Sequence, residues 1–102
     1  MPYPLINLTM HDGSRHFLGL PAVYPPRFLW RSLSKLENAT RGDFLGDMIE
    51  TWFDFSYQGY AFSVHETYGE FWFFANDPDT PDPVLHDICD HFLALIASQT
   101  NL

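Results

Sequence analysis

The sequence predicts a single α+β domain over residues 1–102, with an antiparallel sheet and two helices most simply packed on one face. The sheet would combine an N-terminal hairpin with a three-stranded aromatic meander. Three observations predict this. Ring-bearing runs within residues 52–75 are separated by short turn sequences, apolar residues recur at helical spacing within residues 84–96, and 102 residues with 46% hydrophobic content suit one folded domain.

The N-terminal hairpin is expected from residues 5–20. Ile6, Leu8 and Met10 would share one face of a first strand. An Asp12-Gly13 pair then supplies a tight turn before a second strand over residues 15–20.

A first helix is predicted to begin at the Pro25-Pro26 pair and to run to about residue 38. Three leucines stack on one of its faces, and the opposite face carries three bases: Leu29, Leu33 and Leu36, and Arg27, Arg31 and Lys35. Residues 40–46 are left unassigned, although Phe44, Leu45, Met48 and Ile49 could form a short helical turn.

The meander is predicted with a register. If Gln58-Gly59 is a two-residue turn, the aromatic cross-strand pairs all fall on one face. The expected pairs are Tyr57 with Tyr60, Phe55 with Phe62, and Phe53 with Val64. The third strand, over residues 70–75, has rings on both faces, so it is either covered on both sides or exposes a ring to a partner. The order of the strands is left open.

The second helix follows a stiff acidic connection over residues 77–83. Asp82 would cap it and Pro83 would take the first helical position. The apolar spacing carries the helix to about Ser98 and places Cys89 on its buried stripe.

The charge is distributed unevenly. The net charge is −8, yet residues 1–41 hold all five bases and two acids, which gives +3. Residues 42–102 hold eleven acids and neither lysine nor arginine. Such a segment repels itself, and a cationic protein that docked on it would relieve the repulsion and be steered towards it. The alternative is that the acids only keep an aromatic-rich domain in solution.

Composition disfavours several other classes. The acidic balance opposes direct nucleic-acid binding, which relies on neutralising phosphates with bases. No basic and apolar leader and no long apolar run is evident, so we expect a cytoplasmic protein with no membrane partner. The single Cys89 excludes an internal disulfide and a multi-thiolate zinc site, and no cofactor is expected.

A small metal-dependent enzyme is an alternative interpretation of the second helix. His86 and Asp90 form one i, i+4 pair, and Asp87 and His91 form another. The sequence fixes no third ligand, and pairing of opposite charges explains the same spacing. No phosphate-binding glycine loop and no nucleophile elbow occurs, so no catalytic residue is assigned.

The residues 68–74 (Tyr-Gly-Glu-Phe-Trp-Phe-Phe), the Asp-Pro-rich link and residues 91–96 together resemble small immunity proteins of bacterial contact-dependent growth inhibition systems. The resemblance covers about residues 50–98. It implies a cytoplasmic protein that binds and neutralises a cognate toxin domain, commonly a nuclease. No individual binding residue is carried over from it.

The leading hypothesis is therefore an immunity protein that occludes a basic toxin through an acidic and aromatic surface. The candidate partner-binding residues, taken from the meander, its acidic loops and the last helix, are Asp54, Glu66, Tyr68, Glu70, Trp72, Asp77, Asp79, Asp82, Asp87 and Asp90. The alternatives are an acidic mimic of nucleic acid that inhibits a nucleic-acid-binding protein, the metal-dependent enzyme, and a homo-oligomer joined through the aromatic strand.

Overall fold

The computed structural model of the chain describes residues 4–46 and 51–100, with side chains described as far as residue 98. The described residues form six strands, two α-helices and one 3-10 turn. In chain order these are β1 (Leu8–Thr9), β2 (Arg15–Pro21), α1 (Pro26–Ser32), η1 (Leu33–Lys35), β3 (Ala39–Gly46), β4 (Thr51–Tyr57), β5 (Tyr60–Thr67), β6 (Glu70–Ala75) and α2 (Asp82–Thr100).

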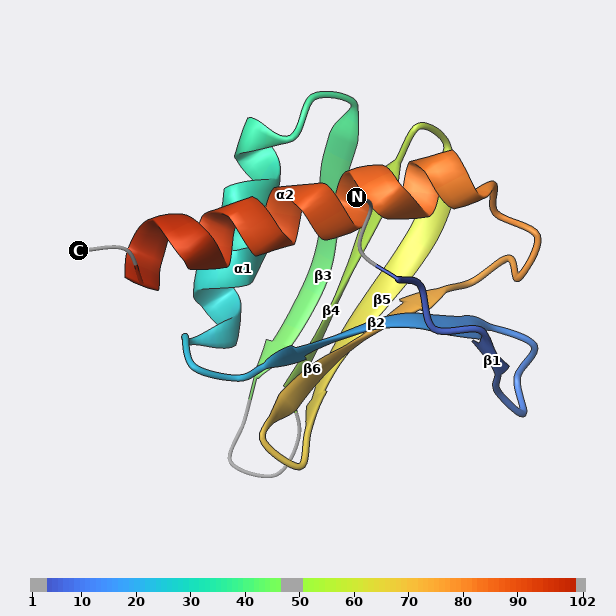
Figure 1. Cartoon of the computed structure of the whole chain (residues 1–102), viewed down its shortest axis with the longest axis horizontal. Coiled ribbons are helices and arrows are strands. Elements are labelled where there is room, and N and C mark those ends of the chain that lie inside the picture. The colour runs from blue at the N-terminus through green and yellow to red at the C-terminus, as the bar shows by residue number, and fades with distance from the viewer. Residues whose placement is uncertain (1–3, 47–50, 101–102) are drawn as a thin grey trace.

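The strands make one antiparallel sheet in the order β1-β2-β6-β5-β4-β3, which confirms the α+β prediction. The N-terminal hairpin, which the sequence left unplaced, joins the sheet beside β6. This position puts β6 between β2 and β5, inside the sheet. Both helices lie on the same face of the curved sheet (Figure 1).

The predicted register of the meander is confirmed. Tyr57 lies opposite Tyr60, and the Phe55–Phe62 and Phe53–Val64 pairs follow. Both turns of the meander place two residues at positive φ, with Gln58 at 52° and Gly59 at 83° in the first turn. The second turn repeats the geometry with Tyr68 at 51° and Gly69 at 76°. This is the two-residue turn that matches the twist of paired strands.

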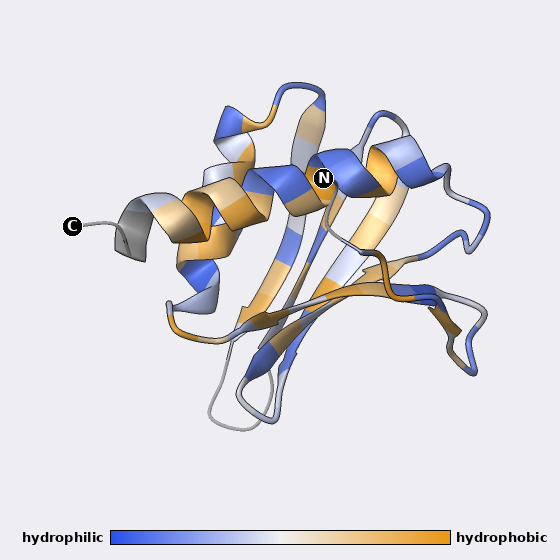
Figure 2. Ribbon diagram, viewed as in Figure 1, coloured by the Kyte–Doolittle hydropathy of each residue, from blue (hydrophilic) through white to orange (hydrophobic). Residues whose placement is uncertain are grey.

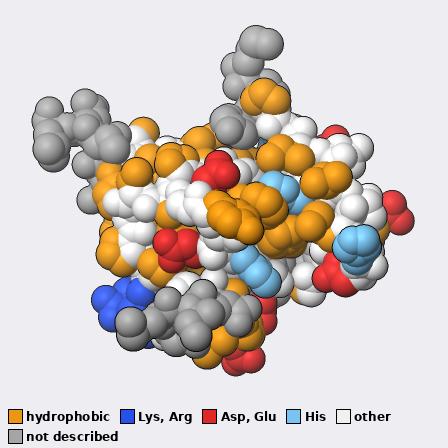
Figure 3. Space-filling model, turned by 90° about the horizontal axis from the view of Figure 1, so that it is seen from below, with side chains coloured by type: hydrophobic (Ala, Val, Ile, Leu, Met, Phe, Trp, Pro, Cys, Tyr) orange, Lys and Arg blue, Asp and Glu red, His pale blue; other side chains and the backbone are white. Residues whose placement is uncertain are grey.

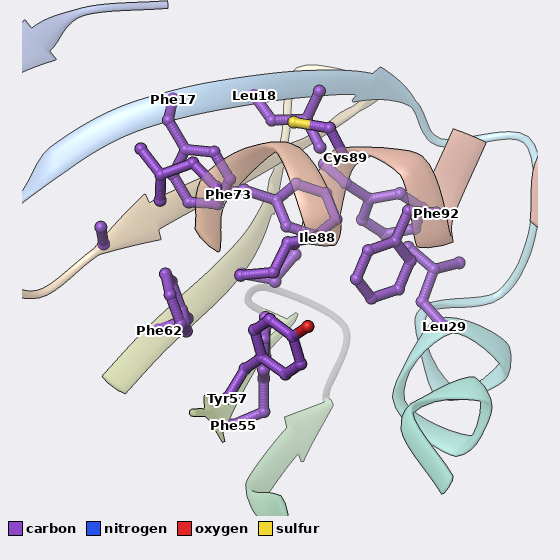
Figure 4. Close-up of a cluster of buried hydrophobic side chains, with 14 of the residues drawn as sticks. Phe17, Leu18, Leu29, Phe55, Tyr57, Phe62, Phe73, Ile88, Cys89 and Phe92 are labelled. Atoms are coloured by element: carbon purple, nitrogen blue, oxygen red, sulfur yellow. The ribbon is translucent and has the colours of Figure 1, made fainter. Parts of the chain in front are cut away.

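The core lies between the sheet and the two helices. Alternate strand residues, among them Phe55, Phe62 and Phe73, point towards α2 (Figure 4). The ring of Phe92 on α2 lies 6.3 Å from Phe55 and 4.9 Å from Phe73 between centroids. Hydrophobic and hydrophilic residues alternate along α2 (Figure 2), as expected for a helix with one buried face.

Residues 40–46, which the sequence left unassigned, belong to the edge strand β3 (Ala39–Gly46). A bulge between Arg41 and Phe44 interrupts its pairing with β4, which explains why no regular alternation is visible in the sequence. Phe44 stacks on Phe53 with centroids 6.1 Å apart. The suggested helical turn is therefore not formed by Phe44 and Leu45, and Met48 and Ile49 lie outside the described residues.

The helix boundaries differ from the predicted ones by a few residues. The first helix was expected to reach residue 38, but α1 ends at Ser32 and continues only as η1. Leu36 has extended dihedrals and Asn38 has a φ of 68°, so the chain turns here into β3. The second helix already begins at Asp82, so this residue lies in the first turn instead of capping it.

Candidate partner-binding surfaces

The candidate partner-binding residues are divided between the two faces of the sheet. Side chains alternate along a strand, so Asp54, Glu70 and Trp72 lie opposite the buried core positions, on the face without helices. Asp87 and Asp90 lie on α2, which covers the other face, and both are exposed. The sheet therefore separates two groups that the sequence had joined into one surface.

The remaining candidates lie along the ends of the strands. Glu66 is exposed near the end of β5, and Tyr68 in the following turn is 94% exposed. Asp77 and Asp79 are exposed in the connection between β6 and α2, which is hydrophilic throughout (Figure 2).

Internal hydrogen bonds hold the acidic connection in shape. The Asp79 amide donates to Oδ1 of Asp77 over 2.9 Å. The buried Thr80 donates from both its amide, over 3.1 Å, and its hydroxyl, over 2.7 Å, to the Asp77 carbonyl. The carboxylates of this loop are thus displayed from a fixed backbone.

One acid of the C-terminal segment has a cationic partner within the described part of the chain. Oδ1 of Asp82 lies 3.2 Å from a guanidinium nitrogen of Arg15. This ion pair ties the beginning of α2 to β2. The Asp82 side chain is 65% exposed, so the pair contributes little to stability.

The polar face of α2 does not assemble a metal site. Asp87 accepts a hydrogen bond of 2.9 Å from the hydroxyl of Tyr57, and Nε2 of His91 lies 3.2 Å from Oγ of Ser32 on α1. Asp87 and His91 are therefore engaged with different neighbours, whereas Nδ1 of His86 is buried without a hydrogen-bond partner among the described residues. Within residues 4–46 and 51–98, no group of three or more histidine, cysteine or acidic side chains could hold a metal ion.

Burial sets the acid–base behaviour of three groups. It lowers the pKa of His16 and of His91 below the usual 6.5. It also raises the pKa of the Cys89 thiol to about 12, because Cys89 lies fully buried on the apolar stripe of α2, as the sequence predicted.

We call the side of the sheet without helices the open face. It carries aromatic and histidine rings together with a few polar side chains. Its members are His16, Trp52, Asp54, Ser63, His65, Glu70, Trp72 and Phe74. Viewed from below, hydrophobic side chains and histidines gather in the middle of the molecule, carboxylates lie around them, and lysine and arginine appear at one edge (Figure 3).

Sequence reasoning singled out Trp72 but missed its neighbours. His16 comes from the N-terminal hairpin and stacks on Trp72 with centroids 4.9 Å apart and planes at 14°. His65 comes from β5 and meets both Phe74 and Trp52. The alternation of rings in β6 hinted at this surface, but the contribution of β2 depended on a strand order that the sequence left open.

The basic side chains lie on the helix side of the molecule. The guanidinium carbon of Arg27 sits 4.4 Å from the centre of the Phe44 ring, and that of Arg41 sits 4.5 Å from the Trp30 ring. Arg31 and Lys35 are exposed on α1 and η1.

No described helix is long and apolar enough to cross a membrane. Comparisons with protein-family models, with curated proteins and with solved structures found no match to this chain.

Proposed function

We propose that this chain is a cytoplasmic immunity protein that binds a cognate basic toxin domain and neutralises it by stoichiometric occlusion. A nuclease is the expected toxin, because enzymes that hold a phosphate backbone do so with arginine and lysine. The resemblance of residues 50–98 to immunity proteins of contact-dependent growth inhibition systems motivates the specific class.

The main observation behind the proposal is how few of the described acids have a cationic partner. Nine of the eleven acids in residues 42–102 lie in the described part of the chain, and among the described residues Asp82 is the one that pairs with a base. Carboxylates left without cations on a folded surface favour association with a protein that supplies them.

The placement of the bases supports the same conclusion. Arg27 and Arg41 lie over aromatic rings on the helix side, and Arg15 is held by Asp82. These cations leave most of the acidic surface uncompensated. A basic partner would therefore meet a favourable field over much of the molecule, which speeds association and orients the encounter.

The proposal is tested by co-expression with the product of the reading frame immediately upstream of the gene. Growth should stop when that product is expressed alone and should be rescued when this chain is present. A charge-reversal series over the described acids of residues 54–90 should weaken the rescue most where the toxin docks. Absence of toxicity, or toxicity without rescue by the unmodified chain, would contradict the proposal.

A further inference from the structure

We propose that the open face is the docking site for an arginine side chain of the cationic partner, and that the guanidinium binds between aromatic rings and carboxylates. The inference rests on the proposed function and names the surface and the chemistry that it uses. It selects the open face over α2, the other acidic surface that the sequence suggested.

The side chains of the open face form two rows across the strands. Trp52, His65 and Trp72 are successive cross-strand partners in the first row. Ser63, Phe74 and His16 follow one another in the second row. Because these strands are paired in the sheet, the rings stand at fixed positions instead of at the end of a flexible loop.

His16 fixes the two rings of β6. It is 7% exposed, and its ring lies 4.9 Å from Trp72 and 5.3 Å from Phe74 between centroids. Nε2 of His16 lies 3.1 Å from the Leu18 carbonyl. A carbonyl can only accept, so Nε2 carries the proton and the ring is held on both its face and its edge. His16 is thus a positioning residue for Trp72 and Phe74.

Two adjoining hollows open on this surface. One, of about 420 Å³, is lined by His65, Glu66, Trp72 and Phe74 together with Met10 and residues from the strand ends. The other, of about 280 Å³, shares Met10, His65 and Phe74 and adds Asp12. Rings and one acidic residue therefore line each hollow, and none of the described residues that line them is a lysine or an arginine.

Glu70 adds a second carboxylate beside Trp72. Its Oε1 accepts a hydrogen bond of 3.4 Å from the Trp72 indole nitrogen. Glu66 and Glu70 lie near the two ends of the β5–β6 turn, since Glu66 pairs with Phe71 and Glu70 pairs with Thr67. A cation at Trp72 would thus have Glu70 beside it. Glu66 lines the larger hollow at its rim, although its pairing with the buried Phe71 puts its strand position on the helix side of the sheet.

This combination favours arginine over the other cationic side chain. A guanidinium is planar and weakly hydrated, so it stacks on an aromatic face while its N–H groups donate to a carboxylate. A lysine ammonium gains the charge interaction but cannot stack in the same way. A nucleic acid could stack its bases on such rings. Its phosphates, however, would meet Asp12, Glu66 and Glu70 with no lysine or arginine among the described residues that line the hollows.

The test uses the full-length protein with two peptide probes, deca-arginine and deca-lysine, followed by NMR of the three tryptophan indole N–H groups. Trp52 and Trp72 report on the open face. Trp30 is an internal control, because its indole donates to the Gly42 carbonyl on the helix side. We expect deca-arginine to shift Trp52 and Trp72, to leave Trp30 in place, and to bind about tenfold more tightly than deca-lysine.

A matched pair of charge variants localises the binding. The double variant E66Q/E70Q removes one charge from the rim of the larger hollow and one from the side chain bonded to Trp72, and it keeps a hydrogen-bond acceptor for Trp72. The double variant D79N/D90N removes the same charge from the acidic loop and α2, where both residues are exposed. E66Q/E70Q should weaken deca-arginine binding about tenfold, and D79N/D90N by about twofold or less.

Equal weakening by both double variants would overturn the inference, because it would show a diffuse field with no site. Equal affinity for the two peptides, or binding of an oligouridine probe at Trp72, would overturn it as well. The inference and the proposed function fail differently. If the unmodified chain rescues growth and E66Q/E70Q rescues it equally well, while D79N/D90N does not, the immunity function stands and the open face is not its docking site.

Discussion

His91 shows how burial decides the role of a single residue. Its ring lies in the seam between the two helices, with Nε2 3.2 Å from Oγ of Ser32. The serine hydroxyl already donates to the Leu29 carbonyl over 2.6 Å, so Oγ accepts and the histidine nitrogen donates. A residue that the sequence offered as a metal ligand thus joins α2 to α1.

This burial makes stability depend on pH. The pKa of His91 and that of His16 are lowered by burial from the usual 6.5, so the folded protein favours the neutral rings. The unfolded chain takes up these protons first as the pH falls through about 6.5. We expect the free energy of unfolding, measured in urea, to be lower at pH 5.5 than at pH 7.5.

The variant His91→Gln, which retains a donor for Ser32, should show a smaller loss over the same pH range. His11→Gln is the control, because His11 is exposed in the N-terminal hairpin and this variant should keep the full pH dependence. A free energy of unfolding that rises or stays constant on acidification would contradict this account.

Cys89 should be chemically silent in the folded protein. Its thiol is fully buried and its pKa is raised to about 12, so almost no thiolate is present at pH 8. A disulfide reagent that reports thiolate release should label one thiol per chain in guanidinium chloride and almost none under native conditions. Rapid labelling of the native protein would place Cys89 outside the core.

At the scale of elements, the strand pairs closed by two-residue turns could be predicted and the irregular pairing could not. The Gln58-Gly59 turn sets the register of β4 and β5, because the partners lie next to each other in the chain. The pairing of β2 with β6 joins residues about fifty to sixty positions apart, and nothing local specifies it. The bulge of β3 breaks the alternation of buried and exposed residues, so the sequence did not reveal this strand.

Only part of the candidate surface could be predicted from the sequence. Trp72 could be identified because alternation within β6 puts it opposite the core, and Glu70 follows it by the same rule. The sequence could not show that α2 and its acids lie across the sheet from them. It also could not show that His16, far away in the chain, stacks on Trp72.

The turn between β5 and β6 carries a conformational cost. Tyr68 has a φ of 51° and is 94% exposed, so its ring gains no packing for adopting a left-handed conformation. Asparagine accepts this conformation more readily and is favoured before glycine in such turns. Tyr68→Asn should raise the free energy of unfolding by about 0.5 kcal/mol.

Tyr68→Val provides the comparison, because a β-branched residue is strained further at positive φ and should destabilise the fold. Both variants are measured by chemical denaturation. If the free energy of unfolding of Tyr68→Asn is no higher than that of Tyr68→Val, residue 68 does not have the left-handed conformation. Weaker partner binding by the stabilised Tyr68→Asn variant would indicate that the exposed ring is kept for contact.

At the scale of the whole molecule, the net charge of −8 governs the electrostatic behaviour of the protein. One ion pair, between Arg15 and Asp82, links acid to base within the described residues. The remaining acids repel one another, and this repulsion weakens the folded state at low ionic strength. Sodium chloride should therefore raise the melting temperature between about 20 and 300 mM.

The D79N/D90N variant should begin from a higher melting temperature in low salt and gain less from added salt. Thermal unfolding followed by circular dichroism measures both proteins under identical buffers. A melting temperature that falls with salt would mean that attractive charge pairs outweigh the repulsion. The acids would then give no reason to expect a cationic partner.

Recovery of the complex with the toxin tests the proposed immunity function most directly. The chain is co-expressed with the tagged product of the upstream reading frame, the tagged protein is captured, and the bound fraction is measured across a salt gradient. We expect a one-to-one complex that forms in low salt and weakens as salt rises. Recovery of the tagged product without this chain at every salt concentration would contradict it.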